Sequence, residues 1–209
     1  MNQDPLLLIL TIAAGLYMAR LWWTDYRAAQ AGRPDPRALP GATAASGKAC
    51  LIAGAGALVI LGAETGGEIA LGLSAQQSSI TLLFGVYTLV AAFIEELIFR
   101  GFIVIEGRGP RLRWAGIMAA SVLFALLHPF LWEWQGGWPG AGGRLTWTLT
   151  AKGAFSTAVV FASSLWFYAV RFARFNPHRS LIPCIAAHAT KNAGVLVIKA
   201  AQGFVVGFW

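Results

Sequence analysis

The stretch Ile80–Ile105 reads ITLLFGVYTLVAAFIEELIFRGFIVI, and it decides the class of fold. Its length and apolar character predict a helix that crosses a membrane, for which about 20 such residues suffice. Three charged side chains interrupt the stretch: Glu95, Glu96 and Arg100. Each charge near the centre of a bilayer costs about 2.5–3.5 kcal/mol on insertion scales, so charges inside such helices generally mark a functional site.

Apolar runs of the same kind recur along the whole chain. Its 209 residues are 57% hydrophobic and only 12% charged, with a mean hydropathy of +0.62. This composition excludes a disordered chain and argues against an ordinary soluble domain. We therefore predict an all-α, polytopic transmembrane helical bundle that forms a single integral membrane domain over residues 1–209. Six segments are expected, at about residues 5–23, 49–63, 78–105, 114–131, 153–170 and 181–199.

The net charge of +7 comes from Lys and Arg residues that lie between the apolar runs. Loops rich in these residues stay in the cytoplasm, so the charge reports topology and does not favour nucleic-acid binding. The basic loops are 24–48, 106–113 and 171–180, and the loops that alternate with them are poor in Lys and Arg. Six crossings therefore place both termini outside. A composition rich in Ala, Gly, Trp and Arg favours the inner membrane of a bacterium.

The loop 129–152 carries Trp132, Trp134, Trp138 and Trp147 among several glycines. Tryptophan prefers the membrane–water interface, so an outer aromatic belt is the simpler interpretation. A mobile gate over a substrate entrance, hinged at the glycines, is the alternative.

The charged residues of the first stretch divide into a pair and a single carboxylate. Glu96 and Arg100 are four residues apart, so they share a helix face and are predicted to pair. Glu95 is rotated from Glu96 by about 100°. It has no partner in its own segment, which suits a reactive carboxylate with a supporting neighbour. For Glu96 and Arg100, a purely structural ion pair is the alternative.

Polar residues in two other segments extend the candidate site. His188 and Asn192 are four residues apart, so both side chains lie on one face of the last segment. A His and an Asn can together donate two hydrogen bonds to a developing oxyanion. His128 closes the fourth segment, where an interfacial or hydrogen-bonded histidine is, by itself, the simpler interpretation and a catalytic residue the alternative. Lys191 lies beside His188 in sequence but is expected off its face.

Two Glu and two His are also potential metal ligands. The zinc signature His-Glu-x-x-His is absent, so a metal would need ligands from three helices. No Gly-x-Ser-x-Gly elbow occurs. Neither Cys50 nor Cys184 has a base nearby in sequence, which argues against a cysteine nucleophile. We expect no metal and no cofactor.

Three motifs appear together and in a fixed order: Glu95-Glu96-Leu-Ile-Phe-Arg100, Phe124-x-x-x-His128 and His188-x-x-x-Asn192. This set resembles the motifs of the CPBP family, the glutamic intramembrane proteases that include the eukaryotic CAAX prenyl endopeptidase (Ras-converting enzyme). The resemblance covers about residues 78–192, within a motif-bearing core at about 78–198.

The resemblance implies a role for each motif residue. Glu95 would be the general base that activates water, with His128 assisting it. His188 and Asn192 would form the oxyanion hole. The reaction would be hydrolysis of a peptide bond within or at the edge of the membrane, without a covalent intermediate and without a required metal.

Glu96 and Arg100 would, by the same resemblance, orient the site. The substrate would be a membrane-anchored peptide or protein. Bacterial members of the family are associated with bacteriocin maturation or self-immunity and with trimming of C-terminal sorting signals. A small chain with no extra domain is similar to the processors of sorting signals, while a prenylated substrate is not expected in a bacterium.

Two other functions stay open at this point. One is a non-catalytic binding or immunity protein of the same fold, and the other is a small transporter whose buried Glu and His relay protons or ions. One geometrical question also stays open. At about 1.5 Å per residue, His128 lies about a turn deeper than Glu95 and His188. The three would meet only if the fourth segment begins deeper than expected or is tilted.

Overall fold

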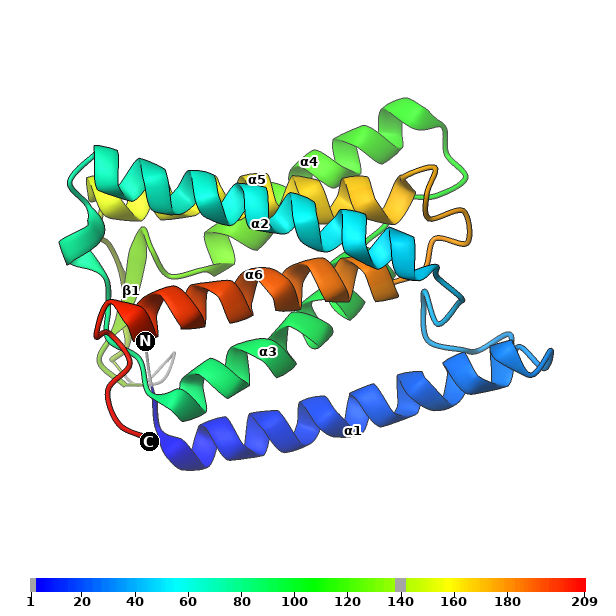
Figure 1. The fold of residues 1–209 in the computed structure, drawn as a ribbon, viewed down its shortest axis with the longest axis horizontal. Coiled ribbons are helices and arrows are strands. Elements are labelled where there is room, and N and C mark those ends of the chain that lie inside the picture. The colour runs from blue at the N-terminus through cyan, green and yellow to red at the C-terminus, as the bar shows by residue number, and fades with distance from the viewer. Residues whose placement is uncertain (1–2, 138–141) are drawn as a thin grey trace.

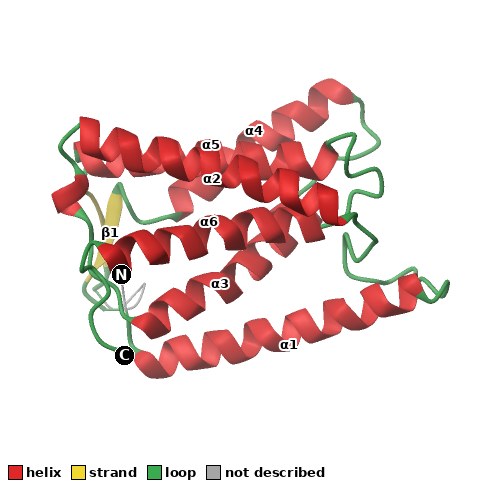
Figure 2. Cartoon of the chain, in the orientation of Figure 1, coloured by secondary structure: helices red, strands yellow, loops and turns green. Residues whose placement is uncertain are grey.

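The computed structural model describes residues 3–137 and 142–209, and in these residues it is a bundle of long helices with one small hairpin (Figures 1 and 2). The chain is thus all-α and polytopic, as predicted. The helices are α1 (Pro5–Gln30), α2 (Gly47–Ala70), α3 (Leu82–Glu96), α4 (Pro110–Leu127), α5 (Ala151–Phe172) and α6 (Ile182–Ala201). A 3₁₀ turn, η1 (Ser74–Gln76), follows α2, and a π-helical turn, η2 (Leu97–Phe102), continues α3.

Side-chain caps explain why several helices begin where they do. The Asp4 carboxylate accepts a hydrogen bond from the Leu7 N–H ahead of α1, and Pro5 occupies the first helical position. Thr81 caps α3 and Thr150 caps α5 in the same manner, each through its hydroxyl oxygen. Such caps satisfy N–H groups that have no partner inside the helix.

Five of the described helices are long and apolar enough to cross a membrane: α1, α2, α3 with η2, α4 and α5. The sixth predicted segment is also a helix, α6, and it packs against α2 and α3. It carries His188, Lys191, Asn192 and Lys199, which lower its hydropathy. The N- and C-terminal ends lie at the same end of the bundle (Figure 1).

The fourth helix, Pro110–Leu127, begins and ends earlier than predicted, and two other helices extend beyond their predicted C-terminal ends. The first helix does not stop at an interfacial Trp22-Trp23 pair but continues to Gln30. Trp22 is buried, and its indole N–H donates to the carbonyl of Pro40 at 3.0 Å, so it is a packing residue. The second helix continues past residue 63 to Ala70. Residues 64–70, which were predicted to lie in a loop, therefore belong to α2, and this part of the helix carries Glu64 and Glu68.

Small residues allow the helices to approach closely. At Gly15 of α1, an added Cβ would lie 2.4 Å from Cγ1 of Val90 in α3. At Gly56 of α2, it would lie 2.1 Å from Cζ2 of Trp166 in α5. Small residues are common at helix contacts in membranes because packing is the main attraction there. Figure 1 shows α1 on the outside of the bundle, lying along α3.

The predicted loop 129–152 contains an antiparallel hairpin of β1 (Trp132–Gln135) and β2 (Arg144–Trp147). Trp132 pairs with Trp147 in the register, and its indole N–H donates to the carbonyl of Leu126 at the end of α4. Trp134 and Trp147 are exposed, while Trp138 lies outside the described residues. The hairpin is at the end of the bundle that carries the termini (Figure 1).

Candidate active site

Glu95 and Glu96 are the last two residues of α3, directly before the π-helical turn η2. In this turn the Ile103 N–H donates to the carbonyl of Ile98, five residues back, at 2.8 Å. Such wide turns are rare, and they occur frequently at functional sites. Helix α5 holds the turn in place, because the Tyr168 hydroxyl donates to the carbonyl of Phe99 and the Arg171 Nε–H donates to that of Arg100.

Arg100 is the centre of a fully buried polar network. Its guanidinium donates to Glu96 Oε1 at 3.1 Å, and both side chains have no exposed surface. The second terminal nitrogen donates to the carbonyl and to the hydroxyl of Ser164, at 3.1 and 2.7 Å. The predicted pairing of Glu96 with Arg100 is therefore confirmed. Aromatic rings surround the guanidinium, with Phe124 nearest at 4.6 Å, an arrangement that favours a cation.

His188 of α6 lies between the two glutamates. Its Nδ1 is 2.8 Å from Glu96 Oε1, and its Nε2 is 3.7 Å from Glu95 Oε2. The Phe167 ring stacks on the imidazole at a centroid distance of 4.7 Å. The carboxylate of Glu96 thus orients the ring, and the opposite nitrogen faces Glu95. Glu95 keeps 31% of its side chain exposed, whereas Glu96 has none.

His128 and Asn192 are each held by one backbone carbonyl. His128 follows the last residue of α4, and its Nδ1 donates to the carbonyl of Phe124 at 2.8 Å. The Asn192 amide donates to the carbonyl of Thr88 at 2.9 Å. Nε2 of His128 and one amide hydrogen of Asn192 remain for other partners. No hydrogen bond joins His128 to Glu95 in the described ranges.

A cavity of about 840 Å³ joins these groups, because Glu95, His128, His188 and Asn192 all line its wall. The motif residues of α3, α4 and α6 thus reach one cavity wall, although the helix rise alone places His128 about a turn from the others. Helix α4 begins earlier than expected, at Pro110, and ends at Leu127.

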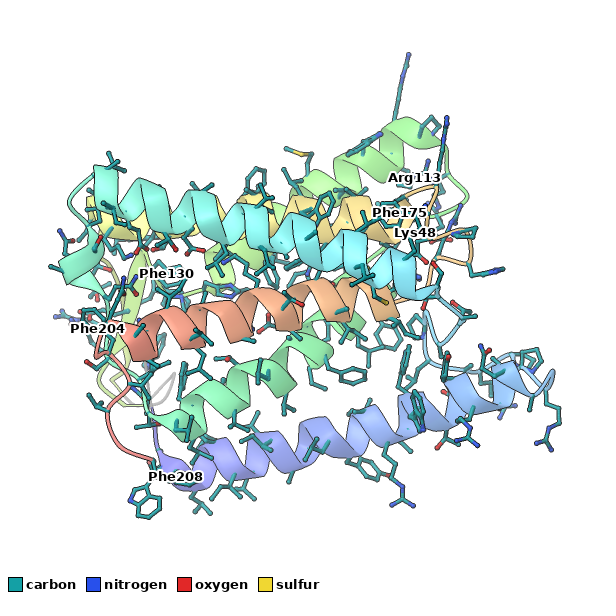
Figure 3. All side chains as sticks on the ribbon, viewed as in Figure 1. Lys48, Arg113, Phe130, Phe175, Phe204 and Phe208 are labelled. Atoms are coloured by element: carbon teal, nitrogen blue, oxygen red, sulfur yellow. The ribbon has the colours of Figure 1, made fainter. Side chains whose placement is uncertain are left out.

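The cavity extends toward the end of the bundle that carries the termini. Its wall includes Leu7 of α1, Glu68 of α2, Lys152 of α5 and Lys199 of α6, all near that end. Figure 3 shows Phe130, another wall residue, at this end and Lys48, at the start of α2, at the opposite one.

Lys191 was expected off the face of His188, and this expectation is wrong. Lys191 lines the same cavity, and its ammonium lies 2.7 Å from Glu64 Oε2 of α2. The spacing of three residues from His188 could have indicated this, because residues three apart are neighbours on a helix surface. Glu64 was missed because it was assigned to a loop.

The described residues contain no group of three or more His, Cys, Asp and Glu side chains arranged to hold a metal ion. The cysteines Cys50 and Cys184 are free thiols, and Cys184 is fully buried. Within the described part of the chain, the groups that face each other at the site are carboxylates, imidazoles and one carboxamide.

Comparison with known families identifies the family of the chain. The model of the Rce1-like family, described as type II CAAX prenyl endopeptidase Rce1-like, matches residues 77–194. The chain belongs to this family. The match begins before α3 and ends within α6, and it contains all residues of the three motifs, from Glu95 to Asn192. No curated protein and no solved structure matches the chain. Family membership, together with the apolar helices, makes the protein a protease-type hydrolase of the membrane.

Proposed function

We propose that this protein is an intramembrane endopeptidase in which Glu95 activates a water molecule to hydrolyse a peptide bond of a membrane-anchored protein or peptide. The water oxygen attacks the carbonyl carbon while one of its protons passes to the Glu95 carboxylate. The C–N bond then breaks, and Glu95 returns that proton to the leaving amine. The products are a carboxylic acid, which keeps the second proton of the water until it ionises, and a new amine, and no covalent enzyme intermediate forms.

His188 and Asn192 stabilise the oxyanion in this proposal. When the His188 ring carries a proton on both nitrogens, Nδ1 donates to Glu96 and Nε2 is left to donate to the oxyanion. Asn192 uses one amide hydrogen on Thr88 and has a second for the same oxygen. Donors that are positioned before the reaction lower the barrier because they need not reorient. His128, through its free Nε2, assists Glu95 by holding the attacking water.

The observation that carries the proposal is the difference between the two adjacent glutamates. Glu96 is fully buried and bound by Arg100 and His188, so its carboxylate is not accessible to a water molecule or a substrate. Glu95 remains partly exposed in a cavity whose wall also holds the proposed donors. A general base needs access to water, and Glu95 is the glutamate of the pair that has it.

The position of the cavity also favours one side of approach. In the described ranges, none of its wall residues comes from the three basic loops. If those loops face the cytoplasm of a bacterium, as the distribution of Lys and Arg predicts, the cleaved segment of the substrate reaches Glu95 from outside the inner membrane. Processing of sorting signals on envelope proteins would require this side.

The test is a comparison of protein termini in the membranes of cells that carry the wild-type chain or Glu95→Gln. Glu133→Gln is the matched control, because Glu133 is an exposed glutamate of the hairpin. New termini should appear with the wild type and with Glu133→Gln, and they should be absent with Glu95→Gln. Asn192→Ala should reduce the rate about 10²–10³-fold, the usual cost of one oxyanion donor.

The same variants separate the two alternative functions. A non-catalytic binding or immunity protein would give identical sets of termini with the wild type and with Glu95→Gln. A proton or ion relay would depend on Glu95 and tolerate Asn192→Ala. Equal expression and folding of all variants, checked by their elution as monodisperse particles in detergent, makes identical termini a contradiction of the protease proposal.

A further inference from the structure

The cavity holds a second set of charged side chains that the proposed reaction does not use. They extend from beside the catalytic groups to the end of the bundle that carries the termini. We call them the charged cluster, and they are Glu64, Glu68, Lys152, Lys191 and Lys199. All five line the cavity wall, and Glu68, Lys191 and Lys199 are each at most 9% exposed.

The charges of the cluster do not balance. Lys191 pairs with Glu64 at 2.7 Å, and Lys152 pairs with Glu68. Each carboxylate thus already has an ammonium partner. Lys199 donates to the carbonyl of Ser78 at 2.6 Å, and no carboxylate lies within ion-pair distance of it in residues 3–137 and 142–209. The cluster therefore carries one positive charge in excess, at Lys199.

An ammonium that is only 9% exposed and has only a neutral partner is costly to bury. Burying a charge disfavours folding unless an opposite charge compensates it. The Phe204 ring, 5.7 Å from the Lys199 ammonium, supplies only weak compensation. An anion that entered the cavity would remove this cost, and Lys199 would bind it with little competition from other protein groups.

Lys199 lies on the same face of α6 as His188 and Asn192, at a fixed distance along the helix. His188, Lys191, Asn192, Val195 and Lys199 form one stripe of α6 along the cavity wall. Lys199 follows His188 by eleven positions, which is about 16 Å along a helix axis. An extended peptide covers about 3.3–3.6 Å per residue. A substrate group bound at Lys199 would thus lie about five residues from a bond bound at His188.

We propose that Lys199 binds a carboxylate of the substrate about five residues from the cleaved bond and thereby selects which bond reaches Glu95. This inference rests on the proposed protease function. The carboxylate is either the free end of the substrate chain or an Asp or Glu side chain at that distance. The Lys191–Glu64 and Lys152–Glu68 pairs hold the wall around it and exclude a second anion.

Binding to a hydrolysis-defective chain tests this inference without turnover. The probes are fluorescent peptides with a Leu/Ala membrane helix followed by Gly-Ser-Ala-Ala-Ala. One ends in a free carboxylate, one in an amide, and one in an amide with Asp as its last residue. The protein is full-length Glu95→Gln in detergent micelles. We expect the free acid, the Asp peptide or both to bind about tenfold more tightly than the plain amide.

Second variants assign the preference to one residue. Adding Lys199→Gln should abolish it, and adding Lys199→Arg should keep it. Lys48→Gln is the matched control, because Lys48 is exposed at the opposite end of the bundle (Figure 3), and the preference should survive this change. Whether the acid or the Asp peptide is preferred identifies the source of the carboxylate.

Equal affinities for all three peptides, including no binding of any, would overturn the inference. Stabilisation of the chain by phosphatidylglycerol in nanodiscs, lost in Lys199→Gln and accompanied by no preference among the peptides, would assign the site to lipid phosphate and overturn it as well. The proposed function is judged separately, by the new termini of the wild type. A carboxylate preference without cleavage would leave the site standing and refute the protease.

Discussion

The buried network around Arg100 allows a quantitative prediction for the substitution Arg100→Met. Methionine has a similar length and fits among the aromatic rings, so the change removes charge and hydrogen bonds more than volume. The variant loses the ion pair to Glu96 and two hydrogen bonds to Ser164. Glu96, which has no exposed surface, then keeps only His188 as a partner.

The expected loss of stability follows from this burial. Removing one member of a buried pair typically costs about 3–5 kcal/mol, because the remaining charge is uncompensated. His188 offsets part of that cost, so we expect about 3 kcal/mol, the lower end of this range. Glu96→Gln in the same chain removes the remaining charge and should recover more than half of the loss. Arg100→Lys retains the charge but not the planar, forked set of donors. Its free energy of unfolding should lie between those of the wild type and Arg100→Met.

Equilibrium unfolding in mixed detergent micelles, titrated with SDS and followed by tryptophan fluorescence, measures these differences. Arg111→Met is the matched control, since Arg111 is exposed, and it should unfold with the wild type. A free energy of unfolding for Arg100→Met within about 1 kcal/mol of the wild type would refute the reasoning, because exposed ion pairs have that magnitude. Failure of Glu96→Gln to recover stability would refute the assignment to an unpaired carboxylate.

Three further predictions concern other parts of the bundle. Tyr168→Phe should destabilise the chain by about 1–3 kcal/mol in the same titration, because carbonyls of the π-helical turn lose their donor; no change would mean that water replaces the hydroxyl. Gly15→Ala should lower the free energy of unfolding by about 1–3 kcal/mol, because the added methyl group overpacks against Val90. Val90→Ala in the same chain should restore stability. A failure to restore it would contradict the close contact. The third prediction concerns orientation and uses a chain whose two native cysteines are replaced by alanine. Gln202→Cys should react with a membrane-impermeant maleimide in intact spheroplasts, whereas Arg33→Cys should react only after lysis. The reverse pattern would invert the predicted orientation.

The sequence alone determined those features that depend on neighbours along the chain. The apolar run around Glu95 predicts a membrane helix, because the hydrophobic length of a bilayer is a local requirement. The pairing of Glu96 with Arg100 follows from a spacing of four, which any α-helix converts into a contact. The family resemblance rests on the same local spacings, and the family match confirms it.

Local sequence patterns gave wrong predictions where the environment of a side chain depends on a segment far away in the sequence. Trp22 has the appearance of an interfacial residue, yet it is buried and bonded to Pro40, so the helix continues beyond it. Glu64 resembles a loop residue until Lys191, from the last helix, supplies its partner. A charge within an apolar helix is tolerated when another helix compensates it, and no local pattern reports that partner.

Only the tertiary structure decided the arrangement of the site. His188 lies between Glu95 and Glu96, and this differentiates two adjacent glutamates into one that is occupied and one that is accessible. Packing of α4 in the bundle brings His128 to the same cavity wall, although the helix rise alone places it a turn away. Depth, tilt and mutual orientation arise from packing among helices that are far apart in sequence. The spacing of residues within one helix does not contain this information.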